Sequence, residues 1–221
     1  MKRLLLIFIA ALSFNIINAQ GSIVFTDRNF ILQENKDPII EEWLEADSNY
    51  QQLNQPEKDV VYWINYVRKQ PQQFYENILT PFLEQFPEIK SSYTKSLTEE
   101  LLSISPRPMF KSSNKLNQVA AAHAKDLGSH SANISHSSFS GESFQQRMTK
   151  AGLINCISEN IYEGKRDALK AVVFLLIDQG VKNVGHRKNI LDKDMQYIGV
   201  SFYPIKKSPS YFVMVQDFSC E

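Results

Sequence analysis

The apolar stretch at residues 168–177 constrains the fold of this chain more than any other feature. Hydrophobic residues recur there at helical spacing, and residues 172–177 are apolar without interruption. A helix that is apolar around its whole circumference is stable only where neighbouring elements cover every side. We therefore expect a central helix at residues 168–177, buried between other layers of the structure.

The rest of the chain is predicted to place helices first and a small sheet last. Helical periodicity with start or stop residues occurs at residues 56–70, 71–80, 114–127 and 144–151. Strand patterns occur at residues 157–162, 197–203 and 211–218, the last two forming a hairpin around a turn at 206–210. Because strands and helices do not alternate, the pattern favours a layered α+β fold over a doubly wound sheet.

The first nineteen residues are typical of a secretory signal peptide. Lys2 and Arg3 precede an apolar run at residues 4–12, and Ala19 provides a small residue for cleavage before Gln20. The run is too short to cross about 30 Å of hydrocarbon as a permanent helix, although an N-terminal anchor is the alternative. We expect a secreted or periplasmic protein without stable membrane insertion after cleavage.

The charge distribution divides the mature chain into an acidic arm and a mildly basic body. The whole sequence holds 24 Lys and Arg against 24 Asp and Glu, so it has no bulk positive field to hold nucleic acid. Residues 20–55 contain seven acids and two basic residues, whereas residues 56–221 contain 17 acids and 20 basic residues. Ile39, Ile40, Trp43 and Leu44 give the arm an apolar face that could dock on the body as a helix.

The two cysteines allow two interpretations. In an oxidising compartment Cys156 and Cys220 could form a disulfide that closes a long loop and constrains the unfolded chain. They could also be two separate buried thiols, since a free cysteine packs as a small hydrophobic residue. The sequence favours the disulfide slightly and leaves both open.

Several large enzyme classes lack their motifs in this sequence. It contains no Gly-x-Ser-x-Gly, His-Glu-x-x-His, P-loop or dinucleotide-binding glycine motif. Its histidines are too widely spaced for a compact structural zinc motif. Spacing alone does not bring these residues together.

The order of several short motifs resembles the CAP superfamily, which unites cysteine-rich secretory proteins, antigen 5 and pathogenesis-related proteins. The matching segments are the helix Leu116 to Leu127, Ser135-His136-Ser137, Arg147, Ala151-Gly152, Ser158-Glu159-Asn160-Ile161, Gly185-His186-Arg187-Lys188-Asn189-Ile190-Leu191, Ile198-Gly199-Val200 and Val215-Gln216-Asp217-Phe218. Asn65 and Arg68 also resemble the opening pattern of the family. The resemblance covers residues 56–221 and leaves the arm outside. Because the cysteine pattern of eukaryotic members is missing, it indicates a bacterial-type branch.

The resemblance implies an α-β-α sandwich in which a three-stranded antiparallel sheet lies between helical layers. It also implies an open cleft lined by two histidines and two acids. His136, Glu159 and His186 match three of these positions. Asp178 falls where many eukaryotic relatives carry the second glutamate, so its side chain is one methylene shorter.

Three kinds of chemistry suit such a tetrad. His136 and His186 could ligate a divalent metal such as zinc in an open site. The same imidazoles and carboxylates could instead form a pH-sensitive hydrogen-bonded network without metal. The third alternative is a purely structural cluster that links helix to sheet through buried polar pairs.

Other candidate residues have plainer interpretations. His123 shares the apolar stripe of its helix and is predicted to be a core histidine, while His130 follows Gly128, the predicted helix stop, and is expected in a loop. Glu142 is a rival carboxylate for the cleft but is expected to cap or begin the helix near Phe144. Ser137 lacks the context of a nucleophile.

Three functions follow as hypotheses. The first is an extracellular binding module whose cleft holds a small molecule, a lipid or a peptide. The second is a hydrolase of extracellular peptide or cell-wall polymer, with Glu159 as general base and His136 and His186 as metal ligands or electrostatic stabilisers. The third is a structural or adhesion protein that contacts a partner through the acidic arm.

Overall fold

The computed structural model describes residues 28–32, 36–130 and 134–221. The predicted signal peptide and the first part of the arm lie outside the described residues. Within these ranges, no helix is long and apolar enough to cross a membrane.

A mixed sheet of four strands lies at the centre of the molecule, in the order β1-β3-β4-β2. The strands are β1 (Lys111–Ser112), β2 (Ile157–Gly164), β3 (Tyr197–Ile205) and β4 (Ser208–Ser219). Strand β4 pairs antiparallel with both β2 and β3, which gives the predicted three-stranded sheet and its hairpin. The two-residue strand β1 adds a short parallel pairing to β3 that the sequence did not indicate.

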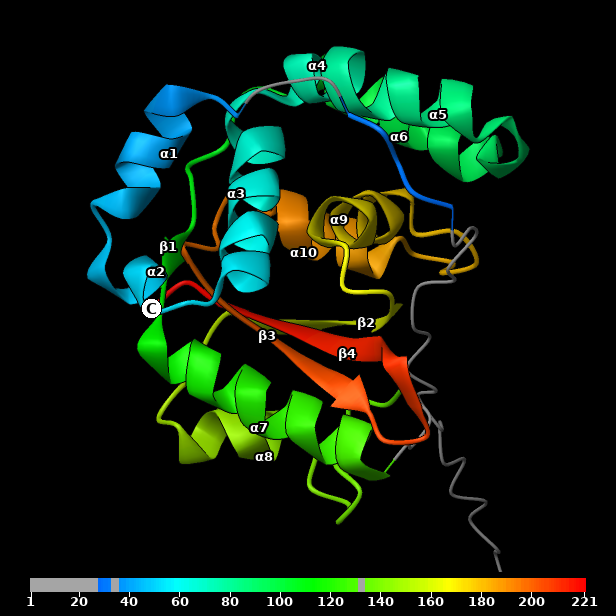
Figure 1. Cartoon of the computed structure of the whole chain (residues 1–221). Coiled ribbons are helices and arrows are strands. Elements are labelled where there is room, and N and C mark those ends of the chain that lie inside the picture. The colour runs from blue at the N-terminus through cyan, green and yellow to red at the C-terminus, as the bar shows by residue number, and fades with distance from the viewer. Residues whose placement is uncertain (1–27, 33–35, 131–133) are drawn as a thin grey trace, which may run out of the picture.

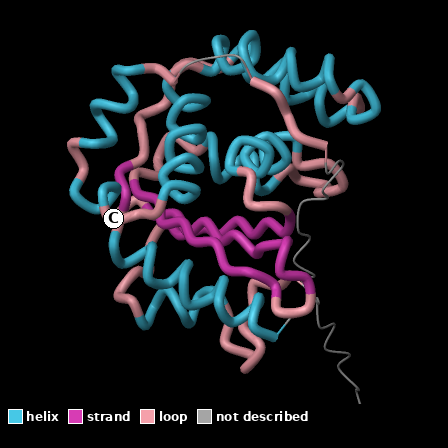
Figure 2. The backbone as a smooth tube through the Cα atoms, in the orientation of Figure 1, coloured by secondary structure: helices cyan, strands magenta, loops and turns pink. Residues whose placement is uncertain are grey.

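Helices cover both faces of the sheet (Figures 1 and 2). Helices α7 (Asn114–His130) and α8 (Phe144–Lys150) lie on one side, and α3 (Gln55–Lys69), α9 (Ala168–Ile177) and α10 (Gly185–Leu191) lie on the other. The outer helical segments are α1 (Pro38–Glu45), α2 (Ser48–Gln51), α4 (Pro71–Phe74), α5 (Thr80–Gln85) and α6 (Ser92–Ser103). The molecule is therefore an α+β protein built as an α-β-α sandwich, as predicted.

Helix α9 is the buried central helix that its composition requires. All ten of its residues are buried, and it contacts α3, α6, α10 and β2. Asp167 caps its first turn by accepting a hydrogen bond from the backbone N–H of Lys170. The helix ends at Asp178, which adopts the left-handed conformation.

The alternation of side chains along the strands gives two hydrophobic cores. Toward α3 and α9, the sheet contributes Tyr162, Ile198, Val200, Met214 and Phe218. Toward α7, it contributes Ile161, Val213 and Val215, which pack against Ala120, Ala124 and Leu127. Because both faces of the sheet are covered, a polar side chain on either face is buried and must find a partner inside the protein.

Two glycines allow α7 to lie directly on the sheet. A Cβ at Gly199 would lie 2.2 Å from the backbone carbonyl carbon of Leu116, so only glycine fits there. Gly128, predicted to stop the helix, lies inside it instead, because a Cβ there would come 2.7 Å from the backbone oxygen of Pro204. Its role is close packing against β3, and α7 continues to His130.

The segment around Pro81 also differs from its prediction. A π-helical turn at Tyr75–Leu79 links α4 to α5, and Pro81 occupies the first turn of α5. A proline inside a continuous helical path removes one backbone hydrogen bond, and the π-helical turn lies directly before it. The helical path therefore continues to Gln85 rather than ending at Pro81. Helices α6 and α10 were not predicted.

The second half of the acidic arm is part of the folded body. Helix α1 docks on α3 with Ile40 and Leu44 buried and Trp43 partly buried, as predicted, whereas Ile39 of the predicted apolar face is 70% exposed. Asp37 caps α1, and its other carboxylate oxygen accepts a hydrogen bond from Gln70 at 2.7 Å.

The cysteines Cys156 and Cys220 form a disulfide between the start of β2 and the end of β4, which settles the alternative that the sequence left open.

Candidate functional site

Glu159 is the centre of a polar cluster on the side of the sheet that faces α7 and α8. Its Oε1 lies 2.7 Å from Nδ1 of His136, and its Oε2 lies 2.7 Å from Nη2 of Arg147. The Glu159 side chain is only 1% exposed. An ionised carboxylate only accepts, so Nδ1 of His136 carries the donated proton.

His136 connects this buried carboxylate to the surface. It lies in the loop between α7 and α8, and its side chain is 36% exposed. The guanidinium of Arg147 donates a hydrogen bond to the backbone oxygen of His136 at 3.0 Å. Arg147 therefore binds both the carboxylate of Glu159, which holds the His136 imidazole, and the backbone of His136 itself.

Arg147 is placed by the start of α8. Ser143 and Gln146 form a capping box, in which each side chain accepts a hydrogen bond from the other's backbone N–H. Arg147 follows in the first turn and points toward the sheet, where it reaches Glu159. Arg147 belongs to the motifs that resemble the family, but the sequence indicated no role for it in the site.

The electrostatics keep Glu159 ionised. Burial alone would raise the pKa of Glu159, but the hydrogen bond from His136 and the neighbouring basic groups His123, Arg147 and His136 outweigh burial and hold it below its usual value of 4.5. A buried carboxylate with a lowered pKa and both oxygens occupied is a poor proton acceptor. The predicted role of Glu159 as general base does not suit this geometry, because substrate cannot reach it.

His123 borders the same cluster from α7. Its Nε2 donates to the backbone oxygen of Ser135 at 2.9 Å and lies 4.0 Å from Oε2 of Glu159. Burial lowers the pKa of His123 despite the opposing effect of Glu159, so the ring is neutral near pH 7. The prediction of a core histidine is confirmed, and this core position also faces the site.

Asp217 is a second acid on this face of the sheet. It pairs with Glu159 across β2 and β4, and it is completely buried. Burial and the negative charge of Glu159 raise its pKa well above the usual value of 3.8. From the sequence, Asp217 was recognisable only as part of a motif that resembles the family. The signal available in the sequence was an acidic residue at position 217, within the strand pattern at residues 211–218.

The other two residues of the predicted tetrad, Asp178 and His186, lie in the α9–α10 layer. Oδ1 of Asp178 is 2.7 Å from Nδ1 of His186, and Oδ2 accepts the backbone N–H of His186 at 2.9 Å. Both residues are buried. Asn160, next to Glu159 in β2 but on the opposite face, donates to the backbone oxygen of His186 at 3.2 Å.

The four predicted residues therefore form two hydrogen-bonded pairs, in which Glu159, Asp178 and His186 are buried and His136 is partly exposed. Among the residues that the structure describes, no group of three or more His, Cys, Asp or Glu side chains is arranged to hold a metal ion. Catalytic zinc sites use three protein ligands. The donor set found here does not fit such a site, so we derive no step through a metal.

The remaining candidates lie at the end of α7 and in the loop between α7 and α8. Glu142 forms an ion pair with Lys150, with Oε1 2.5 Å from Nζ, while the cap of α8 is Ser143. His130 is the last residue of α7 rather than a loop residue, and its ring stacks on Phe139 with 4.0 Å between centroids. Ser137 forms an isolated β-bridge with Ser143.

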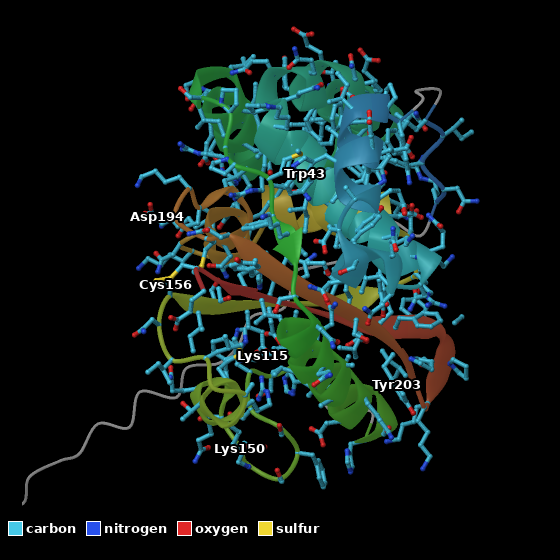
Figure 3. The ribbon with its side chains drawn as sticks, turned by 90° about the vertical axis from the view of Figure 1, so that its left-hand side faces the viewer. Trp43, Lys115, Lys150, Cys156, Asp194 and Tyr203 are labelled. Carbon is cyan, nitrogen blue, oxygen red and sulfur yellow. A yellow bond between two sulfur atoms is a disulfide. The ribbon has the colours of Figure 1, made fainter. Side chains whose placement is uncertain are left out.

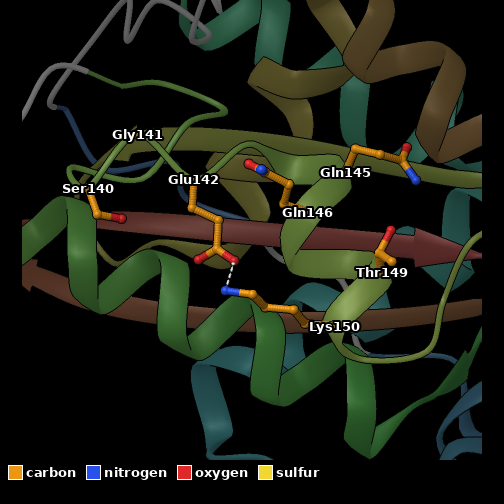
Figure 4. A pocket seen from close by; sticks show the side chains of 7 residues that line it. All are labelled: Ser140, Gly141, Glu142, Gln145, Gln146, Thr149 and Lys150. Carbon is orange, nitrogen blue, oxygen red and sulfur yellow. Dashed lines mark ion pairs between the residues drawn. The ribbon is translucent and has the colours of Figure 1, made fainter.

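Two open hollows flank α8. One, of about 490 Å³, lies between α7 and α8. Its lining residues are Lys115, Gln118, Val119, Ala122, Glu142, Arg147, Lys150 and Ala151. Figure 3 shows Lys115 and Lys150 on this side of the molecule. The other, of about 500 Å³, is lined by polar residues of α8 and the preceding loop, and the Glu142–Lys150 ion pair spans it (Figure 4). Arg147 lines the first hollow and also contacts Glu159, so it connects this hollow to the Glu159 cluster.

Comparison with known proteins decides the family. The sequence model of the cysteine-rich secretory protein family, CAP, matches residues 104–218, which is slightly more than half of the chain. The chain belongs to the CAP family. The match includes His136, Glu159, Asp178 and His186 as well as Arg147 and Asp217. No curated protein sequence matches this CAP protein.

Two solved structures resemble the CAP chain only remotely. One is an extracellular protein containing an SCP domain from Bacillus anthracis, with 22% identity and a TM-score of 0.42 over 52% of this chain and 35% of that one. The other is an outer surface protein from Borrelia burgdorferi, with 22% identity and a TM-score of 0.39 over 57% of this chain and 88% of that one. This chain thus spans about a third of the Bacillus protein.

Proposed function

We propose that this chain is an exported CAP-domain module that binds a small ligand, namely a small molecule, a lipid or a peptide, between α7 and α8. The observation that carries the proposal is the position of Arg147. It lines the hollow of about 490 Å³ and also binds Glu159, which in turn holds the half-exposed His136. A volume of this size suits a small organic ligand.

The lining of the hollow supports binding of a ligand with both apolar and polar groups. Val119, Ala122 and Ala151 provide an apolar floor, and Lys115 and Lys150 provide cationic groups at its edge. Apolar contact contributes affinity, while a few fixed polar groups set orientation. No covalent step is required of any residue in this arrangement.

Export is supported by two observations. The N-terminal nineteen residues are typical of a signal peptide, and disulfides such as Cys156–Cys220 persist mainly in oxidising compartments. We therefore assign the mature chain to the periplasm or the cell exterior. The mass of the secreted protein tests this, because cleavage after Ala19 predicts a chain that begins at Gln20.

A fragment screen by ¹H–¹⁵N NMR tests the binding proposal. Ala122→Trp would fill the hollow, whereas Ala121→Trp places the same ring on an exposed neighbouring position that does not line it. We expect fragments that bind the wild type to bind Ala121→Trp equally and to lose affinity at least tenfold for Ala122→Trp. Equal binding to both variants would refute the location, and the absence of any binding fragment would refute the function.

A second candidate is acid–base hydrolysis of an extracellular peptide or cell-wall polymer by His136. The observation in its favour is the His136–Glu159 hydrogen bond, since a carboxylate that orients an imidazole is a recurrent feature of general-base sites. His136→Ala would then abolish release of soluble fragments from peptidoglycan or of peptides from casein. The binding proposal expects no such release from the wild type.

A further inference from the structure

We propose that Asp217 carries a proton in the folded protein and that this carboxylic acid positions Glu159 for its contact with His136. The proposal concerns a residue that the two-histidine, two-acid pattern does not include. It makes Asp217, rather than Asp178, the second acid of the Glu159 site. It rests on the proposed function only for its consequence in ligand binding.

The strand register places the two acids side by side. Glu159 of β2 and Asp217 of β4 are directly paired in an antiparallel ladder, so their side chains leave the same face of the sheet. Side chains at such positions have Cβ atoms about 4.5–5.5 Å apart. Both side chains are buried, so bulk solvent does not screen their interaction.

The cluster contains too little positive charge for two carboxylates. The charged groups that act on Asp217 are Glu159 from β2 and Arg147 from α8, and His123 of α7 borders the same cluster through Glu159. Its other strand partner, Gly199 of β3, has no side chain. Arg147 is the permanent cation of this set, and it is bound to Glu159. A second buried carboxylate without a cation would carry a large desolvation cost.

A proton on Asp217 removes the second negative charge and allows the two acids to form a hydrogen bond with each other. Two carboxylates only accept, so they cannot bond to each other. Within the described part of the chain, neither oxygen of an ionised Asp217 has a hydrogen-bond partner. Once protonated, Asp217 donates to Glu159, and the raised pKa of Asp217 agrees with this arrangement. Glu159 then receives hydrogen bonds from Asp217, Arg147 and His136.

This arrangement has a consequence for the exposed imidazole. Three donors on one carboxylate restrict its rotation, so the oxygen that accepts from His136 keeps its direction. His136 in turn presents its ring to the surface in one orientation. Loss of the Asp217 proton would place two negative charges beside a single guanidinium and weaken this orientation.

Infrared spectroscopy tests the protonation directly and needs no ligand. Protein labelled with ¹³C at aspartate carboxyl groups should show the carbonyl band of a protonated, buried carboxylic acid at pH 7. The band should be absent from Asp217→Asn and present in Asp194→Asn, which changes an aspartate whose side chain is 73% exposed. No acid band in the wild type at pH 7, or a band that survives Asp217→Asn, would overturn the proposal.

The positioning role is tested by the ¹⁵N shifts of the His136 ring, which report its tautomer and hydrogen bonding. Asp217→Asn keeps a neutral donor and should leave these shifts as in the wild type. Asp217→Leu removes the donor while keeping a side chain branched at Cγ, and it should change these shifts. Unchanged shifts in Asp217→Leu would overturn the role even if the infrared band is found. Both readouts are independent of ligand binding, so they separate this proposal from the proposed function.

Discussion

Glu159 and Asp217 face each other across β2 and β4, and only Glu159 is paired with a cation. The pKa values of the two acids are therefore shifted in opposite directions within the same buried cluster. The guanidinium of Arg147 and the imidazole of His136 lower the pKa of Glu159 against the effect of burial, whereas burial and the charge of Glu159 raise that of Asp217. This difference in environment leads to the first prediction.

The free energy of unfolding of Asp217→Asn should increase relative to that of the wild type as the pH rises. Because the folded-state pKa of Asp217 is raised, the folded protein retains a proton that the unfolded chain releases above about pH 4. The wild type therefore loses up to about 1.4 kcal/mol of stability per pH unit from this group until the pH passes the folded-state pKa. Asparagine does not titrate, so urea unfolding at pH 5 and pH 7 should show a growing advantage of the variant. A constant difference would mean that Asp217 titrates alike in both states.

Arg147→Met should destabilise the fold by about 3–5 kcal/mol, because it leaves the charge of Glu159 buried without its partner. Adding Glu159→Gln removes that charge and should recover a large part of the loss. Thermal and urea unfolding of the wild type, both single variants and the double variant form the required cycle. Additive losses would show that the Arg147–Glu159 ion pair is energetically unimportant.

The Asp178–His186 pair should behave as structural. Asp178→Ala removes the acceptor of two hydrogen bonds and places alanine in a left-handed conformation, with a φ of 56°. We expect a loss of about 2–4 kcal/mol, combining a buried unsatisfied donor with the backbone penalty. Asp178→Asn keeps an acceptor and tolerates this backbone, so it should lose less. Fragment affinity at the hollow should stay the same in Asp178→Asn; a tenfold loss would assign this pair to the ligand site.

Gly199→Ala should lower stability more than alanine substitution at other strand positions. The added Cβ would lie 2.2 Å from the backbone of Leu116, so α7 would have to move away from the sheet. Overpacking of this kind costs about 1–3 kcal/mol or more. Gly141→Ala is a useful comparison, because nothing lies within 4 Å of its added Cβ and only its positive φ opposes it. A smaller loss at Gly199 than at Gly141 would contradict the packing described here.

Local patterns in the sequence predicted much of the fold. The apolar composition of residues 168–177 identified the central helix, and alternation identified the β3–β4 hairpin. Helix α10 was missed because its seven residues are too short for a periodic signal, and α6 because its apolar face is narrow. Gly128 was misinterpreted, because whether a glycine ends a helix or allows close packing depends on a neighbour distant in sequence.

The candidate site was only partly accessible from the sequence. His136 and Glu159 were found through the family resemblance, and the structure joins them. The same resemblance assigned Asp178 and His186 to the cleft, and the structure pairs these two with each other in the α9–α10 layer. The roles of Arg147 and Asp217 depend on strand register and helix packing, which no local pattern contains.

The most direct test of the binding account is an NMR map of the wild-type protein with a saturating fragment. The account predicts that the largest chemical-shift changes occur at Val119, Ala122 and the ring of His136, on the α7–α8 side of the sheet. Changes concentrated in the α9–α10 layer or on α1, with Val119 and Ala122 unaffected, would contradict it.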